Sequence, residues 1–203
     1  MKIICIGRNY AEHIKELSNQ LPSDPVFFMK PDTSIITGNK PFFLPDFSAD
    51  IQYEVELVLK ICKVGKSISE KFASRYYDEI GIGIDFTARD LQTKAKEKGL
   101  PWEIAKAFEG SAPLGKFVPK KELPDLKSIN FHLDKNDKMV QQGSSADMIF
   151  SFDKIISYVS RFFPLKTGDL IFTGTPAGVG PVTIGDHLQA YLENLLLLDF
   201  KVK

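Results

Sequence analysis

The stretch IQYEVELVL, residues 51–59, alternates apolar side chains with mostly polar ones. A period of two residues is typical of a β-strand with one buried face. Glu54 and Glu56 therefore point to the same side of this strand, with their backbones about 7 Å apart. The segment predicts a sheet protein in which one strand presents a pair of carboxylates.

Short apolar runs elsewhere predict further strands on either side of this segment. They lie at residues 3–6, 26–29, 81–84, 129–133 and about 195–200. Helices are expected at residues 8–17, 70–80, 87–99 and 152–163. The first of these helices is expected to be short and exposed. Residues 101–128 are expected to form an irregular surface segment, because glycine and proline interrupt them.

Strands outnumber helices in this prediction, without the regular strand–helix alternation of a doubly wound sheet. We therefore expect an α+β fold with a large mixed β-sheet. Two Gly-Asp turns, at residues 168–169 and 185–186, indicate a sheet that rolls up. Thr87 and Asp90 are spaced as a capping pair at the start of the helix that Gly99 ends.

Length and composition favour one compact domain over residues 1–203. Hydrophobic residues make up 43% and charged residues 26%, as in ordinary globular proteins. The 26 basic and 26 acidic side chains cancel, so nucleic acid and anionic membranes are not expected partners. Lysines that alternate with glutamates are typical of solvated surface. These are Lys94, Lys96, Lys98, Lys120 and Lys121.

The two cysteines and the first residues bear on the cellular compartment. Cys5 and Cys62 lie in apolar, strand-like runs without zinc spacing, so we expect buried, reduced thiols. The apolar run at residues 3–6 is too short for a signal peptide, and no apolar stretch approaches the length of a membrane span. The expected location is the cytoplasm.

Three carboxylates are candidate ligands of a metal ion. Glu54 and Glu56 share one strand face, and Asp85 follows the predicted strand at 81–84. Oxygen ligands without a cysteine or a histidine pair suit Mg²⁺, Mn²⁺ or Ca²⁺ better than Zn²⁺ or Cu²⁺. Periodicity alone also fits the solvated face of an antiparallel strand, with Asp85 as a helix-capping acid.

A histidine–glutamate pair and one lysine are candidates for proton transfer and charge stabilisation. His13 and Glu16 are three residues apart on a predicted helix, so the carboxylate can orient the imidazole to take a proton from water. Lys106 has the charge to bind a carboxylate or stabilise an enolate. The alternatives are a surface histidine–glutamate pair and a surface lysine. The glycine-rich segment at 173–180 lacks the lysine of a P-loop and is a poor nucleotide site.

Six motifs, in this order, resemble the fumarylacetoacetate hydrolase family over essentially the whole chain. They are Gly7-Arg8-Asn9-Tyr10-Ala11-Glu12-His13, Phe28-Met29-Lys30-Pro31, Tyr53-Glu54-Val55-Glu56-Leu57, Asp85-Phe86-Thr87-Ala88-Arg89-Asp90-Leu91-Gln92, Lys106-Ala107-Phe108 and Thr173-Gly174-Thr175-Pro176-Ala177-Gly178-Val179-Gly180. The segment Lys98-Gly99-Leu100-Pro101-Trp102 is similar to the short single-domain branch with acylpyruvate hydrolases and oxaloacetate decarboxylases. The resemblance implies the family's carboxy-terminal-domain fold, a β-sandwich-like roll with a few peripheral helices.

The resemblance also implies a role for residues at matching positions. The implied ligands of Mg²⁺ or Mn²⁺ are Glu54, Glu56 and Asp85. The implied catalytic residues are His13 and Glu16, which activate water, and Lys106, which contacts substrate or enolate. The implied substrate-binding residues are Arg8, Arg89, Gln92 and Thr175. A homodimer and a short helix near His13 that closes as a lid are implied as well.

The implied activity is a divalent-metal-dependent hydrolase that cleaves the C–C bond of acylpyruvates, giving a carboxylate and pyruvate. Cleavage would pass through a pyruvate enolate held on the metal. Oxaloacetate decarboxylation, keto–enol tautomerisation and isomerisation of the 2-hydroxyhepta-2,4-diene-1,7-dioate type stay open as alternatives. A non-catalytic protein that binds the metal or a keto acid is a further alternative.

Overall fold

The computed structural model describes residues 1–16 and 20–203 of the chain. Its strands are β1 (Ile3–Gly7), β2 (Val26–Lys30), β3 (Ile35–Ile36), β4 (Ile51–Tyr53), β5 (Val55–Ile61), β6 (Tyr77–Ile84), β7 (Thr87–Ala88), β8 (Ala112–Pro119), β9 (Asn130–Lys135), β10 (Lys138–Ser144), β11 (Leu170–Phe172), β12 (Gly180–Pro181), β13 (His187–Leu192) and β14 (Leu195–Lys201). Its α-helices are α1 (Ala11–Glu16), α2 (Glu70–Ala73), α3 (Arg89–Lys98), α4 (Glu103–Lys106) and α5 (Phe152–Val159).

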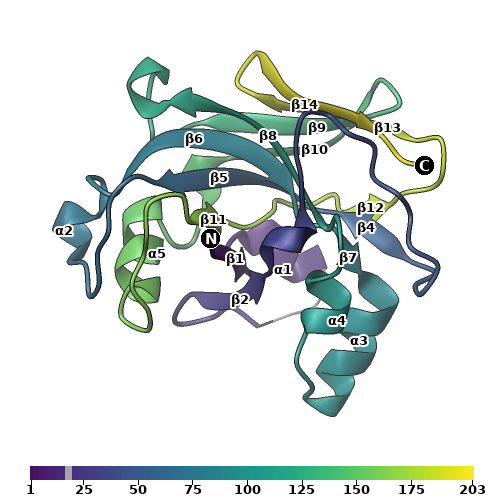
Figure 1. Ribbon diagram of the computed structural model, residues 1–203, viewed down its shortest axis with the longest axis horizontal. Coiled ribbons are helices and arrows are strands. Elements are labelled where there is room, and N and C mark those ends of the chain that lie inside the picture. The colour runs from purple at the N-terminus through teal and green to yellow at the C-terminus, as the bar shows by residue number, and fades with distance from the viewer. Residues whose placement is uncertain (17–19) are drawn as a thin grey trace.

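The strands form one large and two smaller sheets. The large sheet has the order β2-β1-β11-β5-β6-β8-β3, and the smaller ones have the orders β10-β9-β13-β14 and β12-β4-β7. The large sheet is mixed, because β1 is parallel to β11 and antiparallel to β2. Figure 1 shows the two larger sheets as layers of a curled roll, with α2, α3, α4 and α5 at its margins and α1 near the centre of the view. The expected α+β fold with a large, rolled, mixed sheet is confirmed.

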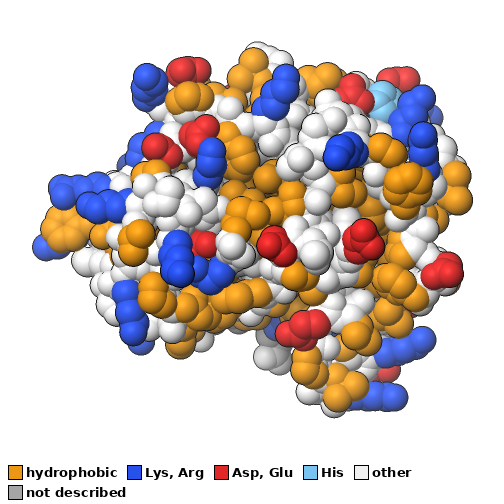
Figure 2. All heavy atoms as spheres, in the orientation of Figure 1, with side chains coloured by type: hydrophobic (Ala, Val, Ile, Leu, Met, Phe, Trp, Pro, Cys, Tyr) orange, Lys and Arg blue, Asp and Glu red, His pale blue; other side chains and the backbone are white. Residues whose placement is uncertain are grey.

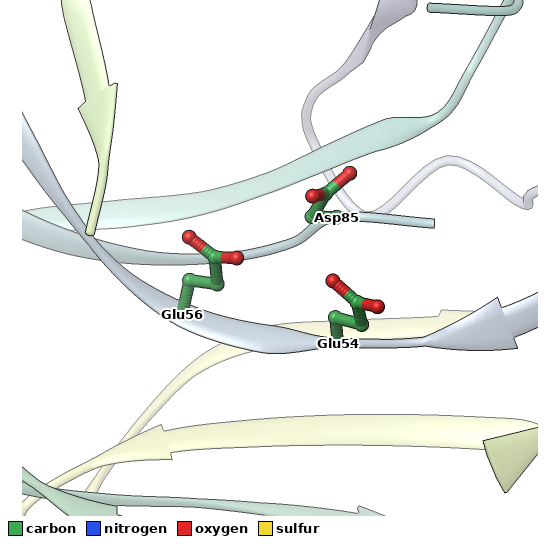
Figure 3. Close-up of side chains that lie close together, drawn as sticks. All are labelled: Glu54, Glu56 and Asp85. Carbon is green, nitrogen blue, oxygen red and sulfur yellow. The ribbon is translucent and has the colours of Figure 1, made fainter. Parts of the chain in front are cut away.

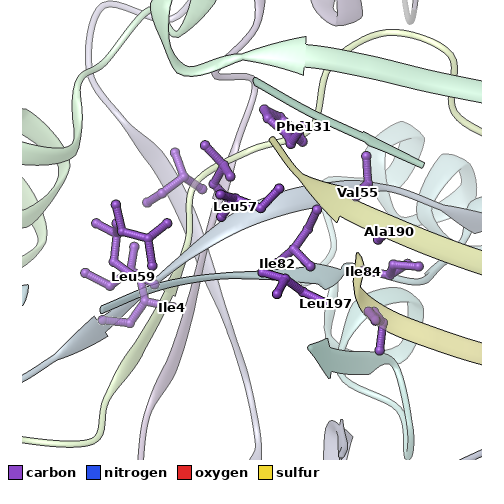
Figure 4. Packing of buried hydrophobic residues seen from close by; sticks show 14 of the residues in the cluster. Ile4, Val55, Leu57, Leu59, Ile82, Ile84, Phe131, Ala190 and Leu197 are labelled. Atoms are coloured by element: carbon purple, nitrogen blue, oxygen red, sulfur yellow. The ribbon is translucent and has the colours of Figure 1, made fainter. Parts of the chain in front are cut away.

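The main core lies between the large sheet and the four-stranded sheet. Leu57 of β5 and Ile82 of β6 pack there with Phe131, Ala190 and Leu197 of the other layer (Figure 4). Burying a large apolar side chain contributes about 1.5–3 kcal/mol relative to leaving it in water. A second apolar cluster contains Ile3, Cys5, Val58, Ala112, Leu114, Leu170 and Phe172. Because β5 contributes to both clusters, it is buried on both faces, and the expectation of one buried face is wrong.

The predicted strand at residues 51–59 is two strands that meet at Glu54. β4 pairs with β7 and β12, whereas β5 pairs with β6 and β11. At the junction, the Glu54 carbonyl accepts a hydrogen bond from Asp85 N at 2.8 Å. The chain therefore changes sheets at the first of the two paired carboxylates.

Residues 70–80 are helical only at their start, so the prediction of a longer helix is wrong. α2 is a single turn, and the chain enters β6 at Tyr77. β6 pairs with both β5 and β8. A Cβ on Gly83 would lie 2.7 Å from the Phe172 ring, so glycine permits the close packing there. Pairing with two distant strands overrides the helical spacing of the local sequence.

Residues 101–128 are more regular than expected. They contain α4 and the eight-residue strand β8. Pro119 ends β8, and Pro113 lies where β8 pairs with the short strand β3, next to a register shift against β6. Proline is tolerated at such irregular strand positions, which is why the prolines in this segment did not exclude a strand.

The other helices lie where the sequence predicts them, with differences in detail. α1 buries His13 and Ile14, so its expected exposure is wrong. Position 17, the predicted end of this helix, lies outside the described residues. α3 ends at Gly99, whose φ of 63° is the expected left-handed cap. Thr87 lies in β7 and does not cap α3, and α5 ends before residue 163.

Both cysteines are free thiols in the part of the chain that is described. Cys5 is buried as expected, whereas Cys62 is partly exposed, so the expectation of a buried thiol is wrong for Cys62. None of the described helices has the length and apolar character needed to cross a membrane. The face in Figure 2 intermixes basic and acidic side chains with apolar ones.

Candidate active site

Three buried carboxylates converge where β5 begins and β6 ends. Val55 of β5 pairs with Ile84 of β6, so Asp85, the next residue, lies beside Glu54. One oxygen atom from each of Glu54, Glu56 and Asp85 lies within 4.8 Å of the others, and their exposed fractions are 5%, 1% and 1%. Figure 3 shows the three side chains pointing into one space. The solvated-strand alternative is wrong for these residues.

The donor set of this cluster fits a hard divalent cation. Three carboxylate groups with neither cysteine nor histidine among them are ligands that Mg²⁺ and Mn²⁺ prefer. Each carboxylate oxygen has two lone pairs, so an oxygen that accepts a hydrogen bond retains one for a metal ion. Glu54, Glu56 and Asp85 would hold such an ion, leaving its other positions to water or substrate.

Buried cations lie against two of the three carboxylates. Lys106 Nζ lies 2.8 Å from Glu54 Oε2 and 2.7 Å from Asp85 Oδ2. Lys30 Nζ lies 2.8 Å from Asp85 Oδ1, and Arg89 forms an ion pair with Glu54 Oε1. Burial would raise the pKa of Glu54, but Lys106 and Arg89 outweigh it and hold that pKa well below its ordinary range. Burial would lower the pKa of Lys106, but Asp85 and Glu54 raise it, so this lysine is an ammonium.

Glu56 has a different environment from its two neighbours. It accepts a hydrogen bond from Gly174 N at 2.7 Å, and it takes part in none of the ion pairs between described residues. Burial, followed by the charges of Asp85 and Glu54, raises the pKa of Glu56 well above its ordinary value. Glu56 is therefore the carboxylate that most needs an added positive charge.

Lys30 is a site residue that the sequence interpretation missed. Its side chain is wholly buried, and it donates to Ser111 Oγ at 2.9 Å as well as to the Lys106 carbonyl. Lys30 thus connects Asp85 to the end of α4, which carries Lys106. The Phe28-Met29-Lys30-Pro31 motif contained a signal, since a lysine inside an apolar strand needs a buried partner.

The histidine–glutamate pair lies on α1 at the edge of the same cavity. His13 Nδ1 lies 3.1 Å from Glu16 Oε2, and Glu16 Oε1 accepts a hydrogen bond from Gly178 N at 3.1 Å. His13 lines the cavity and is only 6% exposed. The alternative of a surface histidine is therefore wrong, whereas Glu16 is exposed. With Nδ1 held by Glu16, Nε2 is the nitrogen left for proton transfer.

The glycine-rich segment at 173–180 orients acidic side chains through its backbone. Gly174 N binds Glu56, and Gly178 N binds Glu16. Gly174 has a φ of 104°, and a Cβ there would lie 2.7 Å from Asn9 Cβ, so glycine is required for this approach. Asn9 fixes the neighbouring backbone by donating to the Thr173 carbonyl at 2.8 Å. The segment positions the carboxylates of the site.

The cavity collects the remaining predicted site residues together with some that were not predicted. Its lining comprises Ile6, Gly7, Arg8, His13, Phe28, Glu54, Glu56, Asp85, Arg89, Gln92, Lys96, Trp102, Lys106 and Thr175. Of the predicted site residues, only Glu16 is outside this lining, and it contacts His13 from behind. Lys96 was expected on the solvated surface, and that expectation is wrong, because the face of α3 that carries Gln92 also turns Lys96 into the cavity.

Comparison with known proteins decides the family. The model of the fumarylacetoacetate (FAA) hydrolase C-terminal domain matches residues 2–203. The chain belongs to the fumarylacetoacetate hydrolase family. The expected resemblance is thereby confirmed.

Relatives in this family carry several activities in their names. Oxaloacetate tautomerase FAHD1, mitochondrial, from Bos taurus is 42% identical over 201 residues, covering 99% of this chain and 91% of the relative. Oxaloacetate decarboxylase, mitochondrial, from Dictyostelium discoideum is 40% identical over 195 residues, covering 96% of this chain and 89% of the relative. The crystal structure of fumarylpyruvate hydrolase from Pseudomonas aeruginosa in complex with Mn²⁺ and pyruvate matches with a TM-score of 0.94 and 35% sequence identity. The match covers 100% of this chain and 89% of that protein.

Proposed function

We propose that this chain is one catalytic domain that uses Mg²⁺ or Mn²⁺ to act on small 2-oxo acids, with keto–enol tautomerisation of oxaloacetate as its reaction. The observation that carries the proposal is the cluster of Glu54, Glu56 and Asp85 in a cavity that also contains His13 and Lys106. The bovine relative named as an oxaloacetate tautomerase supports the choice of reaction.

The carboxylate cluster and its cations suit a 2-oxo acid. A divalent ion held by Glu54, Glu56 and Asp85 would supply a Lewis acid that withdraws charge from the keto oxygen. Arg8 and Thr175 line the same cavity and offer donors to the carboxylate next to the keto group. Lys106, held as an ammonium, stabilises negative charge that develops on the oxygen of the enolate.

His13 is the proposed proton-transfer group. Glu16 holds Nδ1, so Nε2 takes a proton from C3 of the keto acid during enolisation and returns one to C3 during ketonisation. The hydroxyl proton of the enol leaves as the keto group forms, which balances the proton added to carbon. Glu16 is itself fixed by Gly178 N, so the pair is oriented from both sides.

Acylpyruvate hydrolysis is the second candidate, favoured by the same His13–Glu16 pair. Here His13 takes a proton from water, the hydroxide adds to the acyl carbonyl, and the C3–C4 bond breaks to give a carboxylate and pyruvate. The structural neighbour named fumarylpyruvate hydrolase supports this candidate.

Decarboxylation of oxaloacetate releases carbon dioxide and needs no water, and the relative named oxaloacetate decarboxylase supports it.

We propose that two copies of the chain associate through an apolar surface. Phe43, Phe47 and Ile104 are 69%, 50% and 64% exposed, and Phe47 and Ile104 border a depression with Leu91 and Phe108. Exposed apolar surface of this kind favours association. Light scattering should give the mass of a dimer, and Ile104→Asp should shift it towards a monomer. The cytoplasmic location stays a prediction.

Three parallel assays of the purified protein separate the candidate reactions. Ketonisation of enol-oxaloacetate is followed by ultraviolet absorbance, carbon dioxide release from oxaloacetate by a coupled assay, and pyruvate release from acetylpyruvate by lactate dehydrogenase. Each is run with Mn²⁺. We expect the highest kcat/KM for ketonisation, and a higher value for acetylpyruvate would make hydrolysis the function. Metal binding without turnover in any assay would contradict an enzymatic role.

A further inference from the structure

One face of α3 forms a wall of the cavity. Arg89, Gln92 and Lys96 are spaced three and four residues apart and all line it. Arg89 Nη1 donates to Gln92 Oε1 at 2.7 Å, and its Nη2 pairs with Glu54. Lys96 continues this face by one further helical turn. Along this face of α3, Gln92 therefore lies between Arg89 and Lys96, and all three residues line the cavity.

Lys96 differs from the other lysines of the site because it pairs with none of the carboxylates in the described part of the chain. Lys30 and Lys106 are each paired with Asp85. Lys96 takes part in none of the ion pairs formed by the described residues, and its Nζ lies 5.6 Å from the centre of the Trp102 ring. Burial, followed by the charges of Arg89 and Arg8, lowers the pKa of Lys96 to about 8. At neutral pH this side chain is mainly a half-buried cation without a counter-charge.

A half-buried cation costs free energy that an anionic ligand offsets. Glu54 already pairs with Lys106 and Arg89, and Asp85 pairs with Lys106 and Lys30. None of the ion pairs of the described residues joins Lys96 to these two carboxylates or to Glu56. An anionic group of a substrate bound in the cavity would supply the counter-charge that Lys96 lacks there. The carboxylate next to the keto group of a 2-oxo acid is expected to bind near the metal site. The group that pairs with Lys96 is therefore a second carboxylate of the same substrate.

We propose that Lys96 binds the distal carboxylate of dicarboxylic 2-oxo acids and makes the enzyme prefer them to 2-oxo acids with an uncharged end. The proposal rests on the proposed function. A neutral acyl group leaves the ammonium unpaired, and a site with an unpaired buried polar group discriminates strongly against such a ligand. Trp102, which also lines the cavity, contacts the Lys96 ammonium through a cation–π interaction.

Binding measurements test the proposal without requiring turnover. The probes are 2-oxoglutarate and 2-oxopentanoate, which have the same number of carbons and differ in the terminal carboxylate. Calorimetry with the Mn²⁺-loaded full chain should show 2-oxoglutarate binding about 10- to 100-fold tighter, the effect of one charge-assisted hydrogen bond. Lys96→Met should abolish this preference, and Lys96→Arg should restore most of it.

Lys98→Met is the matched control, because Lys98 lies on the same helix and is exposed. It should keep the full preference of the wild type. In turnover assays, Lys96→Met should raise the KM for oxaloacetate relative to the KM for acetylpyruvate. Equal weakening of both probes in Lys96→Met would assign Lys96 a structural role and overturn the proposal, as would a preference that survives the substitution. If the protein shows no turnover but its binding preference depends on Lys96, the proposed function is contradicted and the binding role of Lys96 is supported.

Discussion

Lys106 Nζ and Asp85 Oδ2 lie 2.7 Å apart in the buried centre of the site. Both side chains are at most 3% exposed, and the same ammonium also contacts Glu54. The lysine therefore contacts two of the three carboxylates that would hold the metal ion. This contact predicts that Lys106 contributes to the stability of the folded chain, in addition to its proposed role towards substrate charge.

Lys106→Met should strongly destabilise the metal-free protein. Removing one partner of a buried ion pair leaves a charge uncompensated, at a cost of about 3–5 kcal/mol. Thermal unfolding in the presence of chelator measures the loss. Lys60→Met is the control, since Lys60 pairs with Glu79 at 2.6 Å on the surface, where a pair contributes about 0–1 kcal/mol. A similarly small loss of thermal stability in Lys106→Met and Lys60→Met would contradict the role assigned to Lys106.

His13→Ala should remove acetylpyruvate hydrolysis while sparing much of any oxaloacetate decarboxylation. General-base catalysis contributes about 10²- to 10⁴-fold, and decarboxylation activates no water. Steady-state assays of both reactions measure the split. His187→Ala is a matched control, because His187 Nε2 lies 2.6 Å from Asp199 in a histidine–carboxylate pair outside the cavity. Equal loss of both activities in His13→Ala would refute this division of roles.

Lys96→Met should stabilise the protein at neutral pH, with a gain that fades in alkali. The pKa of Lys96 is about 8 in the folded chain and 10.5 ordinarily. Below pH 8 both states are protonated and folding carries the full cost of burying the charge. Between pH 8 and 10.5 the unfolded state binds more protons, so the wild type gains stability as pH rises.

The gain from Lys96→Met is modest, because the side chain is half exposed and solvent screens its charge. We expect about 1 kcal/mol at pH 7, or roughly 2–4 °C in Tm. The difference in Tm from the wild type, measured between pH 7 and 9.5, checks this. Lys98→Met should show a difference that does not change with pH. A constant gain in Lys96→Met would argue against the lowered pKa.

The sequence predicts those parts of the site that depend on local pattern. Alternation in residues 51–59 places Glu54 and Glu56 on one side, and strand pairing brings Asp85 beside them. Helical spacing likewise predicts the contact of His13 with Glu16. In each case the residues are neighbours in one strand or helix, or lie at the end of a predicted strand. The local sequence therefore determines how their side chains are arranged.

Other parts depend on contacts between distant segments. Lys30 pairs with Asp85, 55 positions away, and no local pattern reveals that contact. Lys96 lies among alternating charges typical of surface, and only the docking of α3 shows which lysine faces the cavity. The strand β8 escaped prediction because Pro113 and Pro119 resemble loop residues, although Pro113 lies next to a register shift and Pro119 is the last residue of the strand.

We propose above that Glu54, Glu56 and Asp85 bind a divalent ion that the reaction requires. The most direct test is ketonisation of enol-oxaloacetate by the wild type and by Glu56→Gln, each with Mg²⁺, with Mn²⁺ and with chelator, beside calorimetry of Mn²⁺ binding. Glu79→Gln, a surface substitution, is the control. We expect that chelator abolishes turnover by the wild type and that either metal restores it, and that Glu56→Gln loses both metal binding and turnover. Turnover that persists in chelator, or undiminished in Glu56→Gln, would contradict this proposal.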